Sequence, residues 1–96
     1  MPKAELYLRS KVTDDGGNIR EIVIWKVEPS ARTPDGLRYR LAFIHAGERR
    51  PGILYDNHSP KGHHRHIGGT QSAYRFETIA KLLRDFETSI NEYSEG

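Results

Sequence analysis

The segment LRYRLAFIH, residues 37–45, alternates apolar and polar side chains and so predicts a β-strand with one buried face. The apolar face carries the odd-numbered residues: Leu37, Tyr39, Leu41, Phe43 and His45. Arg38 and Arg40 project from the opposite face, about 7 Å apart at a rise of ~3.4 Å per residue. The segment therefore indicates a sheet with an apolar surface on one side and cations on the other.

Four other segments have the composition of strands, and turn-forming glycines and prolines separate most of them. These strand-like segments are residues 6–12, 19–27, 53–58 and 63–67. In the first, Leu6, Leu8 and Val12 share one parity, which predicts a half-buried strand. The second is apolar at both parities, which is typical of a central strand or of one whose second face is also partly covered. We expect Trp25 and Tyr39 to lie in the core or in an interface.

The C-terminal part of the chain predicts an amphipathic helix. One stripe of apolar residues recurs at helical spacing: Ile79, Leu82, Leu83, Phe86, Ile90 and Tyr93. Thr78 or Glu77 would mark the start of the helix, and Thr78 is the stronger candidate because its hydroxyl can accept a hydrogen bond from a first-turn N–H. The whole chain, residues 1–96, is expected to form a single α+β domain. Its meandering antiparallel sheet should have four to five strands, with the C-terminal helix packed on one face.

Composition narrows the class of protein. Cysteine is absent, which excludes disulfides and thiolate metal sites. The N-terminal residues lack the apolar run of a signal peptide, and no segment approaches the roughly 18 apolar residues of a membrane span. We therefore expect a cytoplasmic protein without membrane contact. Residues 37–66 hold six basic residues against two acidic ones, so the middle of the chain can attract a polyanion.

The stretch DNHSPKGHHRHIGG, residues 56–69, holds four of the five histidines in the chain. On a strand, His64 and His66 point to the same side, whereas His63 and Arg65 point to the other. By contrast, His45 continues the apolar face of its own strand, so we expect it to be a structural histidine.

Three interpretations of this stretch remain open from the residues alone. His64 and His66 could chelate zinc or another divalent metal with His58 or Asp56 as third ligand, although no second strong ligand pair is present. The stretch could instead be a solvated basic loop.

The third interpretation is acid–base chemistry on a phosphodiester. One imidazole can accept a proton and another can donate one near neutral pH. RNA supplies its own nucleophile, the 2′-hydroxyl, so this reaction requires no metal. The nearby cations would contact the phosphate: Arg38, Arg40, Lys61 and Arg65.

The same region resembles the TumE-like toxin family of toxin–antitoxin systems. The resemblance is carried by four short elements in order: Tyr55-Asp56-Asn57, Lys61-Gly62-His63-His64-Arg65-His66, Tyr74-Arg75-Phe76 and Leu82-Leu83-Arg84-Asp85-Phe86. It implies a growth-inhibiting toxin with a cognate antitoxin and suggests ribonuclease activity. The motif positions carried over to this chain are Tyr55, Asp56, Lys61, His64 and His66.

Together these observations lead us to expect a metal-independent endoribonuclease without a cofactor. His64 and His66 would be the acid–base partners, Asp56 would orient an imidazole, and Tyr55 would support it. Lys61 would complete the catalytic set by holding the phosphate, and the substrate-binding residues would be Arg65, Arg40, Arg38, His63 and His58. A module that binds nucleic acid or antitoxin without catalysis is the alternative, and a histidine-ligated metal-dependent hydrolase is the third candidate. The expected partners are RNA, the antitoxin, which would cover the site or pair with a sheet edge, and a second copy of the chain in a homodimer.

Overall fold

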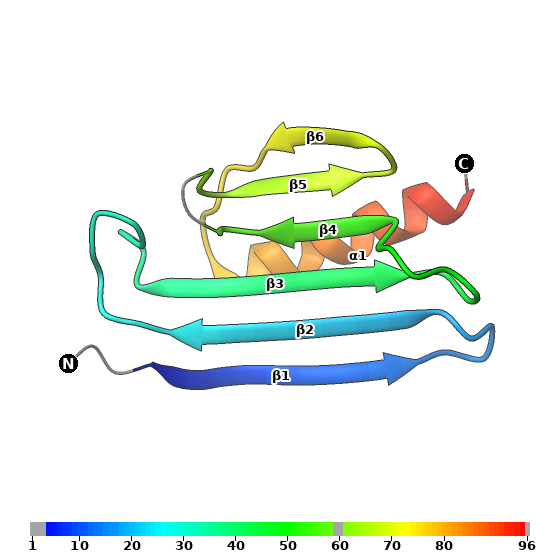
Figure 1. The fold of residues 1–96 in the computed structure, drawn as a ribbon, viewed down its shortest axis with the longest axis horizontal. Coiled ribbons are helices and arrows are strands. Elements are labelled where there is room, and N and C mark those ends of the chain that lie inside the picture. The colour runs from blue at the N-terminus through cyan, green and yellow to red at the C-terminus, as the bar shows by residue number, and fades with distance from the viewer. Residues whose placement is uncertain (1–3, 59–60, 96) are drawn as a thin grey trace.

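The computed structural model describes residues 4–58 and 61–95, which form one antiparallel sheet and one helix (Figure 1). The elements are β1 (Glu5–Thr13), β2 (Ile19–Lys26), β3 (Leu37–Ile44), β4 (Ile53–Asp56), β5 (His64–Ile67), β6 (Thr70–Ala73) and α1 (Ile79–Glu95). The strands follow one another across the sheet in sequence order. The predicted α+β meander with a C-terminal helix is confirmed.

The sheet has six strands rather than the four to five expected. The additional strand is β6, whose residues TQSA are all exposed. A strand without an apolar face gives no periodic signal, so it was not predicted. The β5–β6 hairpin turns at Gly68 and Gly69, and Gly68 has a φ of 62°, which glycine adopts without steric cost.

Helix α1 covers only one face of the sheet, and in Figure 1 it runs behind β3 and β4. The predicted alternation of β3 is confirmed: its core-facing side chains are buried, whereas Arg38 and Arg40 are exposed. We call the face opposite α1 the open face. It carries the even-numbered residues of β3, β4 and β5, because neighbouring strands pair residue by residue without a shift there.

The core lies between the sheet and α1. Its largest fully buried side chains come from both layers: Tyr55, Phe43, Phe86, Ile24, Leu41, Ile53 and Leu82. Thr78 caps the helix as predicted, because its hydroxyl accepts a hydrogen bond from the Lys81 N–H at 3.0 Å. Within the described residues no helix is long and apolar enough to cross a membrane.

The prediction that Leu6, Leu8 and Val12 share one face is wrong for Leu6. A β-bulge interrupts the register, so that Leu6 pairs with Trp25 whereas Leu8 pairs with Ile24. An extra residue in one strand reverses the face of every side chain beyond it. Leu6 therefore projects from the open face of the sheet, and it is 47% exposed.

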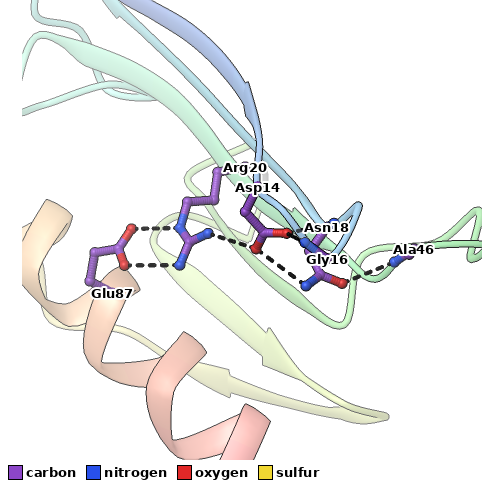
Figure 2. Close-up of polar contacts among 6 residues, drawn as sticks. All are labelled: Asp14, Gly16, Asn18, Arg20, Ala46 and Glu87. Atoms are coloured by element: carbon purple, nitrogen blue, oxygen red, sulfur yellow. Dashed lines mark hydrogen bonds and ion pairs between the residues drawn. The ribbon is translucent and has the colours of Figure 1, made fainter.

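A polar network joins the β1–β2 hairpin to the helix (Figure 2). Asp14 accepts hydrogen bonds from the backbone N–H groups of Gly16 and Asn18 at 2.9 and 3.0 Å. The hydrogen bonds from Asn18, followed by weaker contributions from Gly16 and Arg20, lower the pKa of Asp14. Arg20 then donates to Glu87 of α1 at 2.9 Å. The network is largely exposed, so we attribute the packing of α1 mainly to its apolar stripe.

Substitutions at two adjacent residues of α1, Phe86 and Glu87, separate the contribution of the apolar stripe from that of the polar network. We expect Phe86→Ala to lower the free energy of unfolding by about 3–5 kcal/mol, because it empties a fully buried site. Glu87→Ala removes only the exposed ion pair with Arg20 and should cost less than about 1 kcal/mol. Urea denaturation of both variants measures the difference. An equal cost would mean that the ion pair holds the helix.

Asp85 gives the fold a specific pH dependence. Its carboxylate accepts hydrogen bonds from the Tyr74 hydroxyl at 2.6 Å and from the Lys81 ammonium at 2.8 Å. Burial alone would raise the pKa of Asp85, but the hydrogen bonds from Lys81 and Tyr74 outweigh it and hold the pKa below its usual value. The charged carboxylate is therefore the form that the folded state favours.

A carboxyl group with a lower pKa in the folded than in the unfolded protein stabilises the fold at pH values above its unfolded-state pKa. This stabilisation is lost as the pH falls through the folded-state pKa. We expect Asp85→Asn to reduce the free energy of unfolding by about 1 kcal/mol at neutral pH. The deficit relative to wild type should shrink as the pH falls below about 4. Denaturant titrations of both proteins from neutral pH to below about 4 measure this difference in stability. A difference that does not change with pH would contradict the role of the Asp85 charge.

Candidate functional site

The pairing of β3, β4 and β5 places three charged or titratable side chains in one row across the open face. Asp56 of β4 pairs with Arg40 of β3 on one side and with His64 of β5 on the other. His66 lies two residues further along β5, on the same face. The predicted common orientation of His64 and His66 is confirmed, because their rings lie 5.3 Å apart between centroids and are nearly perpendicular.

His64 is buried and held at both ring nitrogens. Its Nε2 lies 2.9 Å from Asp56 Oδ1, and its Nδ1 lies 2.7 Å from the carbonyl oxygen of Gly62. Gly62 adopts a φ of 71°, a left-handed conformation that suits glycine in the turn before β5. Both partners of the ring are acceptors, and only an imidazolium can donate from both nitrogens. The two contacts therefore fix the orientation of the His64 ring.

Asp56 is fixed in turn by its neighbours. Its Oδ1 accepts the backbone N–H of His58 at 3.2 Å in addition to the contact with His64. The side chain of His58 itself is exposed beyond the end of β4. The expectation that Asp56 lies where it can orient an imidazole agrees with this geometry.

His66 and Lys61 make up the more accessible part of the site. His66 is partly exposed, and Lys61 is exposed. The Lys61 ammonium donates to Gln71 Oε1 at 3.1 Å, and Gln71 is the cross-strand partner of His66. Lys61 therefore lies above β6 on the open face. Gln71 was not among the residues predicted for the site, although a β-hairpin turning at the two glycines would have placed it opposite His66.

A groove of about 450 Å³ continues from Asp56 towards β2. It is lined by Val23, Trp25, Arg38, Tyr39, Arg40, Asp56, Asn57 and His58. Arg38 and Arg40 are exposed, and neither has an ion-pair partner among the residues that the structure describes. Within the described part of the chain, the open face thus offers two guanidinium groups without an ion pair beside the Asp56–His64 pair. Val23, Trp25 and Asn57 had not been predicted to line a site.

His63 lies away from this cluster, against the core. Its Nδ1 lies 2.9 Å from the Tyr39 hydroxyl and its Nε2 lies 2.6 Å from Asp35. Its ring stacks on Phe76 with the centroids 5.1 Å apart. Burial raises the pKa of Tyr39 above its usual range, so the phenol stays protonated and can donate to His63. His63 therefore links the β2–β3 loop to the segment before α1.

Tyr55 and Arg65 also point to the helix side, as the alternation of β4 and β5 requires. Tyr55 is fully buried, and its hydroxyl lies 2.6 Å from the Ser89 hydroxyl of α1. The Arg65 guanidinium donates to the same Tyr55 oxygen at 3.2 Å. The structure therefore brings neither residue together with His64 and His66, which lie across the sheet.

His45 has the structural position expected from its strand. Its ring contacts Phe43 edge-on at 4.9 Å and lies 5.2 Å from the ring of Tyr93 on α1. Within residues 4–58 and 61–95, no group of three or more His, Cys, Asp or Glu side chains is arranged to hold a metal ion.

Comparison with known protein families identifies the chain. The family model described as toxin TumE matches residues 1–94. The chain belongs to the TumE toxin family. Membership indicates a toxin of a toxin–antitoxin system and implies a cognate antitoxin as its partner. Comparisons with curated proteins and with solved structures gave no significant match.

The hydrogen bonds of His64 predict a spectroscopic difference between the two open-face histidines. In ¹⁵N-labelled protein, we expect the ring N–H protons of His64 to be observable and slow to exchange with water, because both are bonded and buried. Those of the more exposed His66 should exchange rapidly. Asp56→Asn should remove the protection at His64 Nε2, since it replaces the charged acceptor by an amide. Unchanged exchange in this variant would contradict the proposed Asp56–His64 pairing.

Proposed function

We propose that this TumE-family toxin cleaves RNA on its open face, without a metal ion, by acid–base chemistry at His66. The observation that carries the proposal is the contrast between two neighbouring imidazoles. His64 is buried and engaged at both nitrogens, whereas His66 beside it is accessible. A ring that transfers protons must have a nitrogen free to meet the substrate.

The reaction would use the 2′-hydroxyl of RNA as the nucleophile. His66 removes the proton of this hydroxyl, and the 2′-oxygen then forms a bond to the adjacent phosphorus. The bond from phosphorus to the 5′-oxygen breaks, and the departing oxygen takes a proton from the Lys61 ammonium. The products are a 2′,3′-cyclic phosphate end and a 5′-hydroxyl end. Water then returns the proton from His66 to Lys61, which restores the enzyme.

The surrounding charges suit the negative charge that builds up on the phosphate oxygens. Arg40 stands in the same row as Asp56 and His64, and its guanidinium can contact two oxygens at once. His64 would add a positive charge between Arg40 and His66 when its ring is protonated. In this proposal Asp56 is a positioning residue, because it acts through His64.

Two candidates would have other roles. Tyr55 would support the fold beneath the site, because it contacts Ser89 and Arg65 on the helix side. His63 would hold the β2–β3 loop through Asp35. His58 and Arg38 remain candidates for RNA binding, because both line the groove on the open face.

Replacement of His66 tests the proposal. We expect His66→Ala to abolish RNA cleavage by the purified protein in the presence of EDTA and to relieve growth arrest on inducible expression. Loss of one acid–base group typically reduces the rate by about 10²- to 10⁴-fold. RNA ends should be followed over time, with circular dichroism used to confirm that the variant is folded.

His45→Asn is the matched control, because it changes a histidine on the helix side of the sheet. It should leave cleavage intact. Cleavage by His66→Ala at the wild-type rate would contradict the proposed role of His66. Cleavage by wild type that EDTA abolishes would indicate a metal-dependent hydrolase. Retention of intact RNA without new ends would indicate a binding module.

A further inference from the structure

Trp25 occupies an unexpected position beside the site. It lies on the open face of β2, where it pairs with Arg38 and lines the groove that ends at Asp56. It is partly exposed, so of the two positions that the sequence predicted, core or interface, the core is excluded. Its neighbour on the same face of β2 is Val23, which pairs with Arg40. An apolar floor therefore adjoins two exposed guanidinium groups.

We infer that Trp25 is a stacking platform for a base of single-stranded RNA, which makes the site selective for unpaired nucleotides. This inference rests on the proposed ribonuclease function and specifies its substrate class. Indole is a large flat surface on which any nucleobase can stack. A base within a duplex is already stacked and paired, so it could not lie against Trp25 without leaving the helix.

The cations around the groove distinguish RNA from an apolar protein segment as its occupant. Arg38 and Arg40 have no ion-pair partners among the described residues, so their charges are available to a phosphate backbone. The alternation of an aromatic surface with free cations is the pattern that binds single strands. A purely apolar peptide would leave both guanidinium groups without compensation.

The position of Trp25 also predicts whether it affects RNA binding or the chemical step of cleavage. Trp25 is on β2 and the proposed acid–base residue His66 is on β5, three strands away, which corresponds to at least roughly 14 Å at the usual strand spacing. A stacked strand advances by only about 3.4 Å per nucleotide. The base on Trp25 therefore belongs to a nucleotide beyond the scissile linkage. Trp25 should strengthen RNA binding and leave the chemical step unchanged.

The chain contains a single tryptophan, so its fluorescence reports on this position directly. The probe is a short oligouridylate with 2′-O-methyl groups, which has no nucleophile and cannot be cleaved by the proposed reaction. On titration into the wild-type protein, we expect binding, measured by anisotropy of the labelled probe, to quench Trp25 fluorescence. Inorganic polyphosphate, which carries charge without bases, should bind without quenching. Duplex RNA should bind more weakly than the single strand.

Substitutions provide a second readout. We expect Trp25→Ala to weaken probe binding by roughly 5- to 150-fold, the range seen when one base–aromatic stack is lost. With cleavable RNA it should raise KM and leave kcat unchanged. Trp25→Phe keeps an aromatic surface and should retain most of the affinity. Tyr7→Ala is the control, because Tyr7 is an exposed aromatic residue outside the groove.

The outcomes separate the two proposals. Probe binding without quenching, together with wild-type affinity in Trp25→Ala, would overturn the stacking platform and leave the ribonuclease proposal intact. No binding of the probe and no cleavage of RNA would overturn both. Quenching by an apolar peptide but not by the probe would assign the groove to a protein partner. Equal affinity of the protein for duplex RNA and for single-stranded RNA would overturn the proposed selectivity for unpaired nucleotides.

Discussion

The alternation of side chains along β4 and β5 is the constraint on which the site depends. Two adjacent residues of a strand must point to opposite faces, so each strand contributes to two different environments. In β5, Arg65 turns towards Tyr55 and the helix, whereas His64 and His66 turn away from it. The same rule separates Tyr55 from Asp56 in β4. A shift of one residue in the pairing would exchange the core and the site.

The single helix determines which face remains available. Because α1 covers only one side of the sheet, the other side keeps polar and charged groups in contact with solvent. The Asp56–His64 pair is an exception on this open face, because His64 is buried and Asp56 is partly buried, and its hydrogen bonds compensate for the loss of water. A small chain can thus combine a stable core on one side with a fixed charged row on the other.

Much of this arrangement could be predicted from the sequence, because it follows from periodicity. The alternation in residues 37–45, the apolar stripe of α1 and the common side of His64 and His66 all arise from local geometry that repeats along the chain. Thr78 as a cap likewise depends only on its immediate neighbours. These predictions needed no knowledge of which strands pair.

The remaining features depend on contacts between distant segments. His63 precedes β5 by one residue, yet its environment is set by Asp35 and Phe76, which only the folded chain brings near. The bulge that reverses Leu6 has no sequence signal of its own, and β6 lacks an apolar face. Trp25 was expected in the core or in an interface, but its face is decided by the register with β3.

Mapping RNA contacts onto both faces of the sheet tests the central claim most directly. The measurement is the change in backbone and side-chain NMR signals when a non-cleavable single-stranded RNA is added to the labelled protein. The account predicts large changes at Arg40, His64 and His66, with little change at Arg65 on the same strand or along α1. Changes concentrated at Arg65 and α1, with the open face unaffected, would contradict it.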